Sequence, residues 1–254
     1  MLPDLPPKTE DLYFTELVGE QKELYRQVAS RQAVPLIQQL HDEQSPIPYM
    51  HIFALLSALK QVCNHPASYL RDVENYTRYD SGKWGAFIEL LEEAQESGQK
   101  VVVFSQFLSM LDIMSLYLNS KNIGFAQIRG STKDRREEIE RFQHDPSCQV
   151  FLGSLQAAGL GIDLTAGSIV IHYDRWWNAA RENQATDRVH RIGQNRGVMV
   201  YKLMTAKTIE ERIDQMIARK ARLFEDVIAY DDHQVVKKLD RAELLELLEG
   251  LDSI

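Results

Sequence analysis

The chain has few cysteines, no long apolar run and no overall positive charge, and each absence excludes a class of protein. Its two cysteines, Cys63 and Cys148, form no CxxC pair, which argues against a disulfide framework and against a thiolate zinc site. No apolar run approaches the roughly 20 residues that span a bilayer. The first residues, MLPDLPPKTEDL, have neither the basic start nor the apolar centre of a signal peptide. We therefore expect an intracellular protein without a membrane partner, cytoplasmic in a bacterium or nuclear in a eukaryote.

The net charge of -8 counts against a nucleic-acid partner, but the charge is unevenly distributed. Residues 175–202 contain six Arg or Lys against two acids, whereas residues 240–254 contain five acids and one Arg. A modest basic zone therefore lies at residues 175–202, and the C-terminal end of the chain is acidic.

Hydrophobic spacing predicts helices first and then strands that alternate with helices. Residues 21–39 and 49–62 have helical character, after an irregular lead. Strands are expected at residues 100–105, 125–128, 149–154, 168–173 and 198–203, and helices at residues 108–119, 133–142, 181–192 and 209–228. This alternation is typical of a parallel sheet covered by crossover helices. We divide the chain into a helical segment 1–80, an α/β lobe 81–230 and an acidic C-terminal helix 231–254.

Polar and glycine-rich loops follow four successive strands of the predicted sheet. In parallel sheets of this kind, ligands bind beyond the carboxyl ends of the strands. A single such loop is more simply explained by turn and capping chemistry. Four of them favour a binding edge. The loops are Ser105 to Phe107, Arg129 to Thr132, AAGLGIDLT from Ala157 to Thr165, and DRWWN from Asp174 to Asn178.

The helix expected at residues 181–192 would place Gln184, Arg188 and Arg191 along one face. An ordinary surface helix has such a face, with Asp187 paired to Arg191. Two guanidinium groups on one stripe also suit bidentate contact with phosphate oxygens. Spacing alone leaves both interpretations open.

Two other short motifs imitate ligand sites. Ser81, Gly82 and Lys83 resemble the end of a phosphate-binding P-loop, but the first glycine of GxxxxGK[ST] is absent and Trp84 replaces its final hydroxyl residue. Cys63 to His65 has no second ligand pair, so a packed turn is the simpler interpretation and we expect no metal site.

An ordered set of motifs resembles a known family. The set is FSQF, RGSTKDRREEIERF, AAGLGIDLT, DRWWN and QATDRVHRIGQ, flanked by LPPKTE, KQVCNHP, SGK and TIEERIDQMIARK. It is similar to motifs IV to VI of the Swi/Snf-type ATPases of helicase superfamily two, with Ala179 where that family commonly has proline. The resemblance implies an α/β fold with a RecA-like parallel sheet, helices on both faces, an N-terminal helical part and C-terminal helices.

The resemblance also implies roles for single residues. Arg188 and Arg191 resemble arginine fingers that reach ATP bound to another lobe, and Gln184 resembles the residue that opens their motif. Gly161 and Asp163 resemble positions near the nucleotide. Residues similar to DNA contacts are Ser105, Gly130, Ser131, Arg135, Ser154 and Trp177. Of the pair Trp176 and Trp177, we expect one to be buried and the other to be functional.

No GxxxxGK[ST] and no DExH-like strand end occurs, so ATP and Mg²⁺ would be bound mainly by an N-terminal RecA-like lobe elsewhere in a longer protein. Together with this absence, the family resemblance implies that the chain is the second lobe of an ATP-driven double-stranded DNA translocase, inactive alone, with a DNA-bound protein complex as a further partner. Two alternatives stay open. An RNA-helicase lobe would share the sheet, although its motif would read more like HRxGR than HRIGQ. A scaffold without catalytic activity would also retain the fold.

Overall fold

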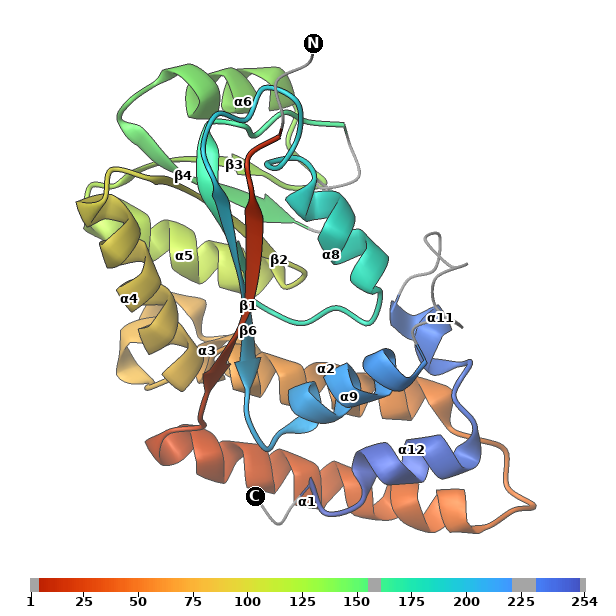
Figure 1. Ribbon diagram of the computed structural model, residues 1–254. Coiled ribbons are helices and arrows are strands. Elements are labelled where there is room, and N and C mark those ends of the chain that lie inside the picture. Colours follow the sequence, from red (N-terminus) through yellow and green to blue (C-terminus); the bar gives the residue numbers. More distant parts are fainter. Residues whose placement is uncertain (1–4, 155–160, 221–231, 252–254) are drawn as a thin grey trace. The chain divides into compact units, whose positions relative to one another are not determined.

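The computed structural model describes residues 5–154, 161–220 and 232–251 (Figure 1). These residues form two compact units, each assembled from separate stretches of the chain. One unit contains Met1–Tyr13, Gly85–Arg175 and Ala180–Leu203, and the other contains Phe14–Trp84, Trp176–Ala179 and Met204–Ile254. Our division at residues 80 and 230 is by consecutive segments, whereas both units are discontinuous in sequence.

The sheet has six parallel strands and confirms the predicted α/β class. Their spatial order is β1 (Lys8–Thr15), β6 (Val198–Thr205), β5 (Gly167–His172), β2 (Lys100–Ser105), β4 (Cys148–Ser154) and β3 (Gly124–Ile128). The central strands β2, β4 and β5 are almost wholly buried, which explains why their sequences are mostly apolar and lack a regular polar alternation. All five predicted strands are confirmed within one residue at each end, apart from two extra residues at the end of β6.

The helices of this unit cover both faces of the sheet. From β2 the chain passes through α5 (Leu108–Ser120) to β3, and then returns through α6 (Arg135–His144) to β4. Because crossovers between parallel strands are right-handed, these opposite directions place α5 and α6 on opposite faces. The step from β5 through α8 (Ala179–Thr186) to β6 runs in the return direction, so α8 lies on the face opposite α5 (Figure 1).

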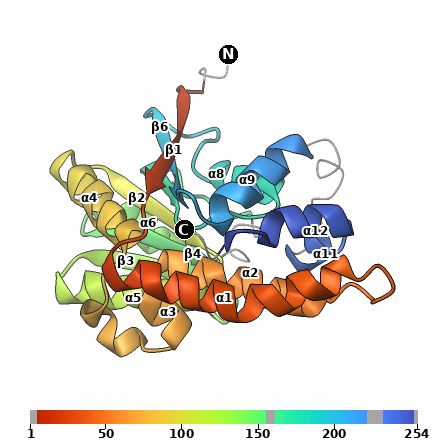
Figure 2. The ribbon, with the colours of Figure 1, turned by 90° about the horizontal axis from the view of Figure 1, so that it is seen from below.

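The second unit is helical. Its elements are α1 (Gly19–His41), α2 (Tyr49–Asn64), α3 (Pro66–Leu70), the 3₁₀ helix η1 (Val73–Arg78), α9 (Ile209–Arg219), α11 (Asp232–Val236) and α12 (Arg241–Leu248). Figure 2 shows α1 alongside α2, and α9 and α12 pack on this pair. Their apolar faces form one core that includes Leu55, Ile213 and Leu247. One further helix, α4 (Gly82–Glu96), begins in this unit and continues in the sheet unit.

The predicted helix at residues 209–228 is described as far as Arg219, and its remainder falls mostly in residues 221–231, outside the described residues. Among the described residues, no helix combines the length and apolarity needed to cross a membrane.

The irregular lead that we predicted at the N-terminus is wrong, because residues 8–15 form the edge strand β1. Its sequence, KTEDLYFT, contains Lys, Glu and Asp, which are depleted in strands, and most of its residues are exposed. Pairing with β6 stabilises it: the Val198 amide donates to Pro7 O at 3.0 Å, and Lys202 Nζ contacts Glu10 Oε2 at 2.7 Å. A strand that depends on such distant partners has no local signal.

Candidate functional site

Most candidate residues lie at one of the two ends of the parallel strands. We call these the amino edge and the carboxyl edge of the sheet. In the parallel register, Lys100 pairs with Gly167 at the amino ends of β2 and β5, and Phe104 pairs with His172 near their carboxyl ends. Ser105 and Ser154 therefore lie at the carboxyl edge. By contrast, Arg188 is held by residues that precede β5, because its carbonyl oxygen accepts a hydrogen bond from Leu164 N at 3.0 Å. The arginine motif therefore lies at the amino edge, opposite Ser105 and Ser154, since α8 carries the chain back across the sheet.

At the carboxyl edge, Ser105 stabilises the turn that follows β2. Its side chain is fully buried and donates a hydrogen bond to Asp174 Oδ2, at the start of the DRWWN loop. Asp174 Oδ1 also accepts from Gln106 N at 3.2 Å, and Ser105 Oγ accepts from Phe107 N at 3.1 Å. The partners of the Ser105 hydroxyl therefore lie inside the protein. The contact to DNA that the resemblance implies for Ser105 stays a prediction.

The loop after β3 is accessible and brings three predicted residues together. Gly130 and Ser131 are exposed, and Arg135 Nη2 donates to Gly130 O at 3.1 Å. Neighbouring Arg129 is engaged by Asp112, with Nη1 and Oδ1 2.6 Å apart. Arg135 is placed by the start of α6, where Asp134 caps the helix by accepting from Glu137 N at 3.1 Å. This loop therefore presents small residues and one guanidinium group, as a phosphate contact requires.

Ser154 ends β4 and is 5% exposed. Its Oγ has no hydrogen-bond partner among the described residues, which is unusual for a buried hydroxyl. The loop that follows it, residues 155–160, lies outside the described residues.

Trp176 and Trp177 are both buried, at 1% exposure each. Trp177 belongs to the core of the helical unit, together with Ile213 and Leu247. We expected one tryptophan to be buried and the other to be functional, and the structure buries both. The contact to DNA that the resemblance implies for Trp177 stays a prediction. A large apolar ring gains more from burial in a packed core than from partial exposure in a loop.

The arginine motif is not a continuous helix. We predicted a helix over residues 181–192, but α8 ends at Thr186 and residues 187–193 form turns and bends. The amide of Arg188 donates to Ala185 O at 3.1 Å, a three-residue spacing that tightens the chain, while its own carbonyl is taken by Leu164 N. Gln184, Arg188 and Arg191 therefore do not share one helical face. Arg188 is half-buried and Arg191 is exposed.

The loop before β5 holds the two predicted nucleotide-proximal residues. Gly161 and Asp163 are both exposed, and Gly161 has a φ of +63°, which suits glycine. Asp163 is fixed from α6, because Gln143 Nε2 donates to Asp163 O at 2.9 Å and to Oδ1 at 3.0 Å. We call residues 187–193 the arginine segment. Since the Leu164 amide donates to the Arg188 carbonyl, Asp163 and the arginine segment both lie at the amino edge.

A buried charge network that the sequence analysis missed supports α8. Arg175, which is 5% exposed, is hydrogen-bonded to Glu182, which is 1% exposed. Lys202 lies between Glu182 and Glu10, at 3.9 and 2.7 Å. Burial raises the pKa of Glu10, but hydrogen bonds from Lys202 and Lys8 outweigh it and lower this pKa to about 2. Nothing local in the sequence indicates the pairing, since its members come from β1, the DRWWN loop, α8 and β6.

His172 is a buried histidine that joins β5 to α8. Its Nε2 lies 2.9 Å from Thr186 Oγ1, and its ring is stacked on Phe104. Burial, together with the positive charges of Lys202 and Arg175, lowers the pKa of His172 to about 3. In the other unit, burial lowers the pKa of His65 to about 4.

These two histidines predict a loss of stability in mild acid. Their pKa values in the folded chain are below the ordinary 6.5, so between pH 6.5 and about 4 the unfolded chain binds more protons. The contribution of the two neutral histidines to the free energy of unfolding is therefore largest above pH 6.5. Between pH 7 and pH 5 the free energy of unfolding falls by about 2 kcal/mol for each histidine. Urea unfolding at both pH values measures the loss. The His65→Gln/His172→Gln variant should show a shallower dependence, and an unchanged slope would contradict the assignment.

Among residues 5–154, 161–220 and 232–251, no group of three or more His, Cys, Asp or Glu is placed to hold a metal ion. The groups suited to a phosphorylated ligand are instead the arginine segment and the loop around Gly130.

Comparison with known proteins relates this arrangement to one group of enzymes. A family model described as the helicase conserved C-terminal domain matches residues 82–193. The chain is 37% identical to an uncharacterized ATP-dependent helicase of Mycoplasma pneumoniae, with 98% of the chain and 23% of the relative covered. It is 37% identical to the lymphoid-specific helicase of Homo sapiens, with 78% of the chain and 26% of the relative covered. The chain thus spans about a quarter of the length of these relatives.

Two solved structures from Sulfolobus solfataricus have the same fold. The SWI2/SNF2 ATPase C-terminal domain is 33% identical, with a TM-score of 0.72, and 95% of this chain and 98% of that one are covered. The SWI2/SNF2 ATPase core in complex with dsDNA is 35% identical, with a TM-score of 0.77, and 98% of this chain and 52% of that one are covered.

Proposed function

The chain belongs to the SWI2/SNF2 ATPases as a C-terminal helicase domain, and from this premise we propose that it is the second RecA-like lobe of an ATP-driven translocase on double-stranded DNA. The observation that carries the proposal is the separation of two sets of groups on one sheet. An arginine segment lies at the amino edge and an accessible loop around Gly130 lies at the carboxyl edge. One edge would serve ATP hydrolysis and the other would hold DNA.

In this mechanism, Arg188 and Arg191 stabilise charge that develops on the transferred phosphoryl group when an N-terminal lobe carrying ATP and Mg²⁺ closes on this one. Guanidinium groups suit this role, since they remain charged and donate from a planar fork. Gly161 and Asp163 adjoin the arginine segment and would line the same side of the interlobe site, and Gln184 on α8 opens the arginine motif. These residues supply position and charge, while the chemistry of the metal and the triphosphate belongs to the partner lobe.

At the other edge, Gly130, Ser131 and Arg135 would grip the DNA backbone, with Ser154 as a further hydroxyl donor. Contacts of this kind hold phosphates without reading sequence, as movement along DNA requires. Closure and reopening of the two lobes would then move this grip along the duplex. In support, a relative with 35% identity has been solved as a complex with dsDNA. A DNA-bound protein complex is a further proposed partner of the full-length enzyme.

Steady-state ATP hydrolysis by the full-length protein tests this proposal, measured with duplex DNA, single-stranded DNA and duplex RNA. We expect duplex DNA to stimulate hydrolysis most strongly. Preferential stimulation by RNA would favour an RNA helicase, and no hydrolysis under any condition would favour a scaffold. The isolated chain should not hydrolyse ATP and should bind DNA weakly and in a salt-dependent way. Stoichiometric, micromolar ATP binding by the isolated chain would contradict the division of labour between lobes.

A further inference from the structure

Gln194 follows the arginine segment directly, and its side-chain amide contacts five backbone groups. We propose that Gln194 is a positioning residue that holds the turn bearing Arg188 and Arg191 against the loop before β5, so that both guanidinium groups are in place when the lobes close. This inference rests on the proposed function, because it concerns how the proposed arginine fingers are positioned.

The amide of Gln194 joins three segments. Its Nε2 lies 2.8 Å from Gly167 O, 3.2 Å from Thr165 O and 3.1 Å from Val189 O. Its Oε1 accepts from the backbone amides of Asn195 and Arg196, both at 2.9 Å. The nitrogen faces only acceptors and the oxygen faces only donors, so the contacts themselves determine the orientation of the amide. One side chain thus serves five backbone groups.

The side chain of Gln194 is buried, whereas the tip of the turn that it would position is exposed. Gln194 is 6% exposed, whereas Ile192, two residues earlier, is 72% exposed and Arg191 is also exposed. Gly193 lies between them with a φ of +106°, a conformation that residues with a Cβ rarely adopt. The chain therefore turns sharply at Gly193, which directs Arg191 outward and Gln194 inward.

Other hydrogen bonds tie the turn to distant segments before its exposed tip. The Leu164 amide binds Arg188 O at 3.0 Å, before the exposed tip, and His190 Nε2 lies 2.7 Å from Pro6 O. After the tip, the Gln194 side chain connects residue 189 to the loop at residues 165–167. Without it, the described contacts that fasten the turn lie mainly on the Arg188 side. A displacement of about 1 Å in a group that stabilises a transition state can reduce the rate about a hundredfold.

The chemistry of the amide distinguishes Gln194 from similar side chains. Glutamate has the same shape but presents an acceptor to the carbonyl oxygens of Thr165, Gly167 and Val189, so it loses the donor contacts and adds repulsion. Methionine fills a similar volume without hydrogen bonds, and asparagine keeps the amide but is one methylene too short. The three substitutions test the donor, the whole amide and its reach separately.

The experiment measures DNA-stimulated ATP hydrolysis by the full-length protein carrying Gln194→Glu, Gln194→Met or Gln194→Asn. We expect kcat to fall about 10- to 100-fold, with little change in the KM for ATP or in the affinity for duplex DNA, because the buried Gln194 side chain would act through the arginines and not by touching either ligand. Gln99→Met is the matched control. Gln99 Oε1 accepts from Ser168 Oγ at 2.8 Å beside the same end of β5, without a described contact to the arginine segment. This control should keep the wild-type kcat.

A double-variant comparison separates positioning from general weakening of the fold. In the Arg188→Ala/Arg191→Ala background, Gln194→Met should lower kcat no further, because the groups that it positions are gone. A further reduction of similar size would overturn the proposal. So would a wild-type kcat in a folded Gln194 variant, or the failure of all three single variants to fold, because the residue would then be purely structural.

The arginine variants also distinguish the two proposals. If Arg188→Ala and Arg191→Ala hydrolyse ATP at the wild-type rate, the proposed function of the arginine segment fails. If they are inactive while folded Gln194 variants have the wild-type kcat, only the positioning role fails.

Discussion

Replacing Arg188 or Arg191 by alanine in the full-length protein should slow DNA-stimulated ATP hydrolysis by about a thousandfold to a hundred-thousandfold. This effect is large because a guanidinium group that reaches the phosphoryl group acts mainly on the transition state, where charge is spread over the phosphoryl oxygens. A loss confined to kcat is expected, since ATP is held mainly by the other lobe. Single-turnover hydrolysis with bound duplex DNA measures it without interference from product release.

Two variants make this result interpretable. Arg196→Ala removes the same charge from an exposed position just after this segment, beyond Gln194, and should leave hydrolysis close to the wild-type rate. Arg191→Lys keeps the charge but loses the planar fork, so it should recover little of the lost activity. Hydrolysis near the wild-type rate in both alanine variants would show that the segment does not act on ATP.

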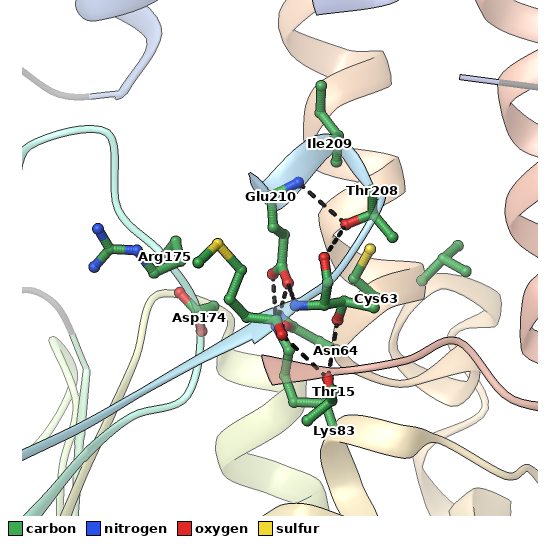
Figure 3. Close-up of polar contacts among 12 residues, drawn as sticks. Thr15, Cys63, Asn64, Lys83, Asp174, Arg175, Thr208, Ile209 and Glu210 are labelled. Atoms are coloured by element: carbon green, nitrogen blue, oxygen red, sulfur yellow. Dashed lines mark hydrogen bonds and ion pairs between the residues drawn. The ribbon is translucent and has the colours of Figure 1, made fainter. Parts of the chain in front are cut away.

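Removing Glu210 should destabilise the helical unit by about 3 to 5 kcal/mol, because its partner Lys83 would keep an uncompensated charge in the interior. Both side chains are fully buried, and Lys83 Nζ lies 2.6 Å from each carboxylate oxygen of Glu210 (Figure 3). Asn64 Oδ1 accepts from the same ammonium group at 3.1 Å, and Thr205 N donates to Glu210 at 2.8 Å. The pair thus connects the starts of α4 and α9.

Urea unfolding of Glu210→Ala, followed by circular dichroism, measures this loss. Glu246→Ala is the matched control, because its ion pair with Arg219 also joins two helices of the unit at 2.7 Å, but both side chains are more than half exposed. It should cost no more than about 1 kcal/mol. Replacing both buried partners, as in Lys83→Met/Glu210→Met, should recover much of the stability. If Glu210→Ala and Glu246→Ala cost the same, the buried pair is not the anchor that its geometry indicates.

Lys83 also shows where sequence motifs mislead. Ser81 to Lys83 imitates the end of a phosphate-binding loop, and the missing first glycine argued against that interpretation. The structure agrees, since Lys83 is turned into the protein and its ammonium group is bound to Glu210. The sequence excludes the wrong role, but it does not identify the partner, because Lys83 and Glu210 are 127 residues apart.

The arginine motif identifies the family, but the helix predicted over residues 181–192 ends at Thr186. QATDRVHRIGQ identifies the family without structural information, because a sequence motif is recognised from the identity and order of its residues alone. Its conformation was not predictable, since the end of α8 at Thr186 depends on Leu164 taking the Arg188 carbonyl, and on Gln194 binding residues 165 and 167. Contacts between segments about 25 residues apart decide this conformation, and helical periodicity contains no information about them.

The sequence by itself determined the alternation of buried strands with helices, the family, and the order of its motifs, because apolar periodicity and side-chain identity are local properties. Only the tertiary structure decided that β1 pairs with β6, that both tryptophans are buried, and that the arginine segment and the Gly130 loop occupy opposite edges of the sheet. Each of these outcomes depends on which distant groups meet, and pairing and burial energies are gained only when the chain brings those groups together.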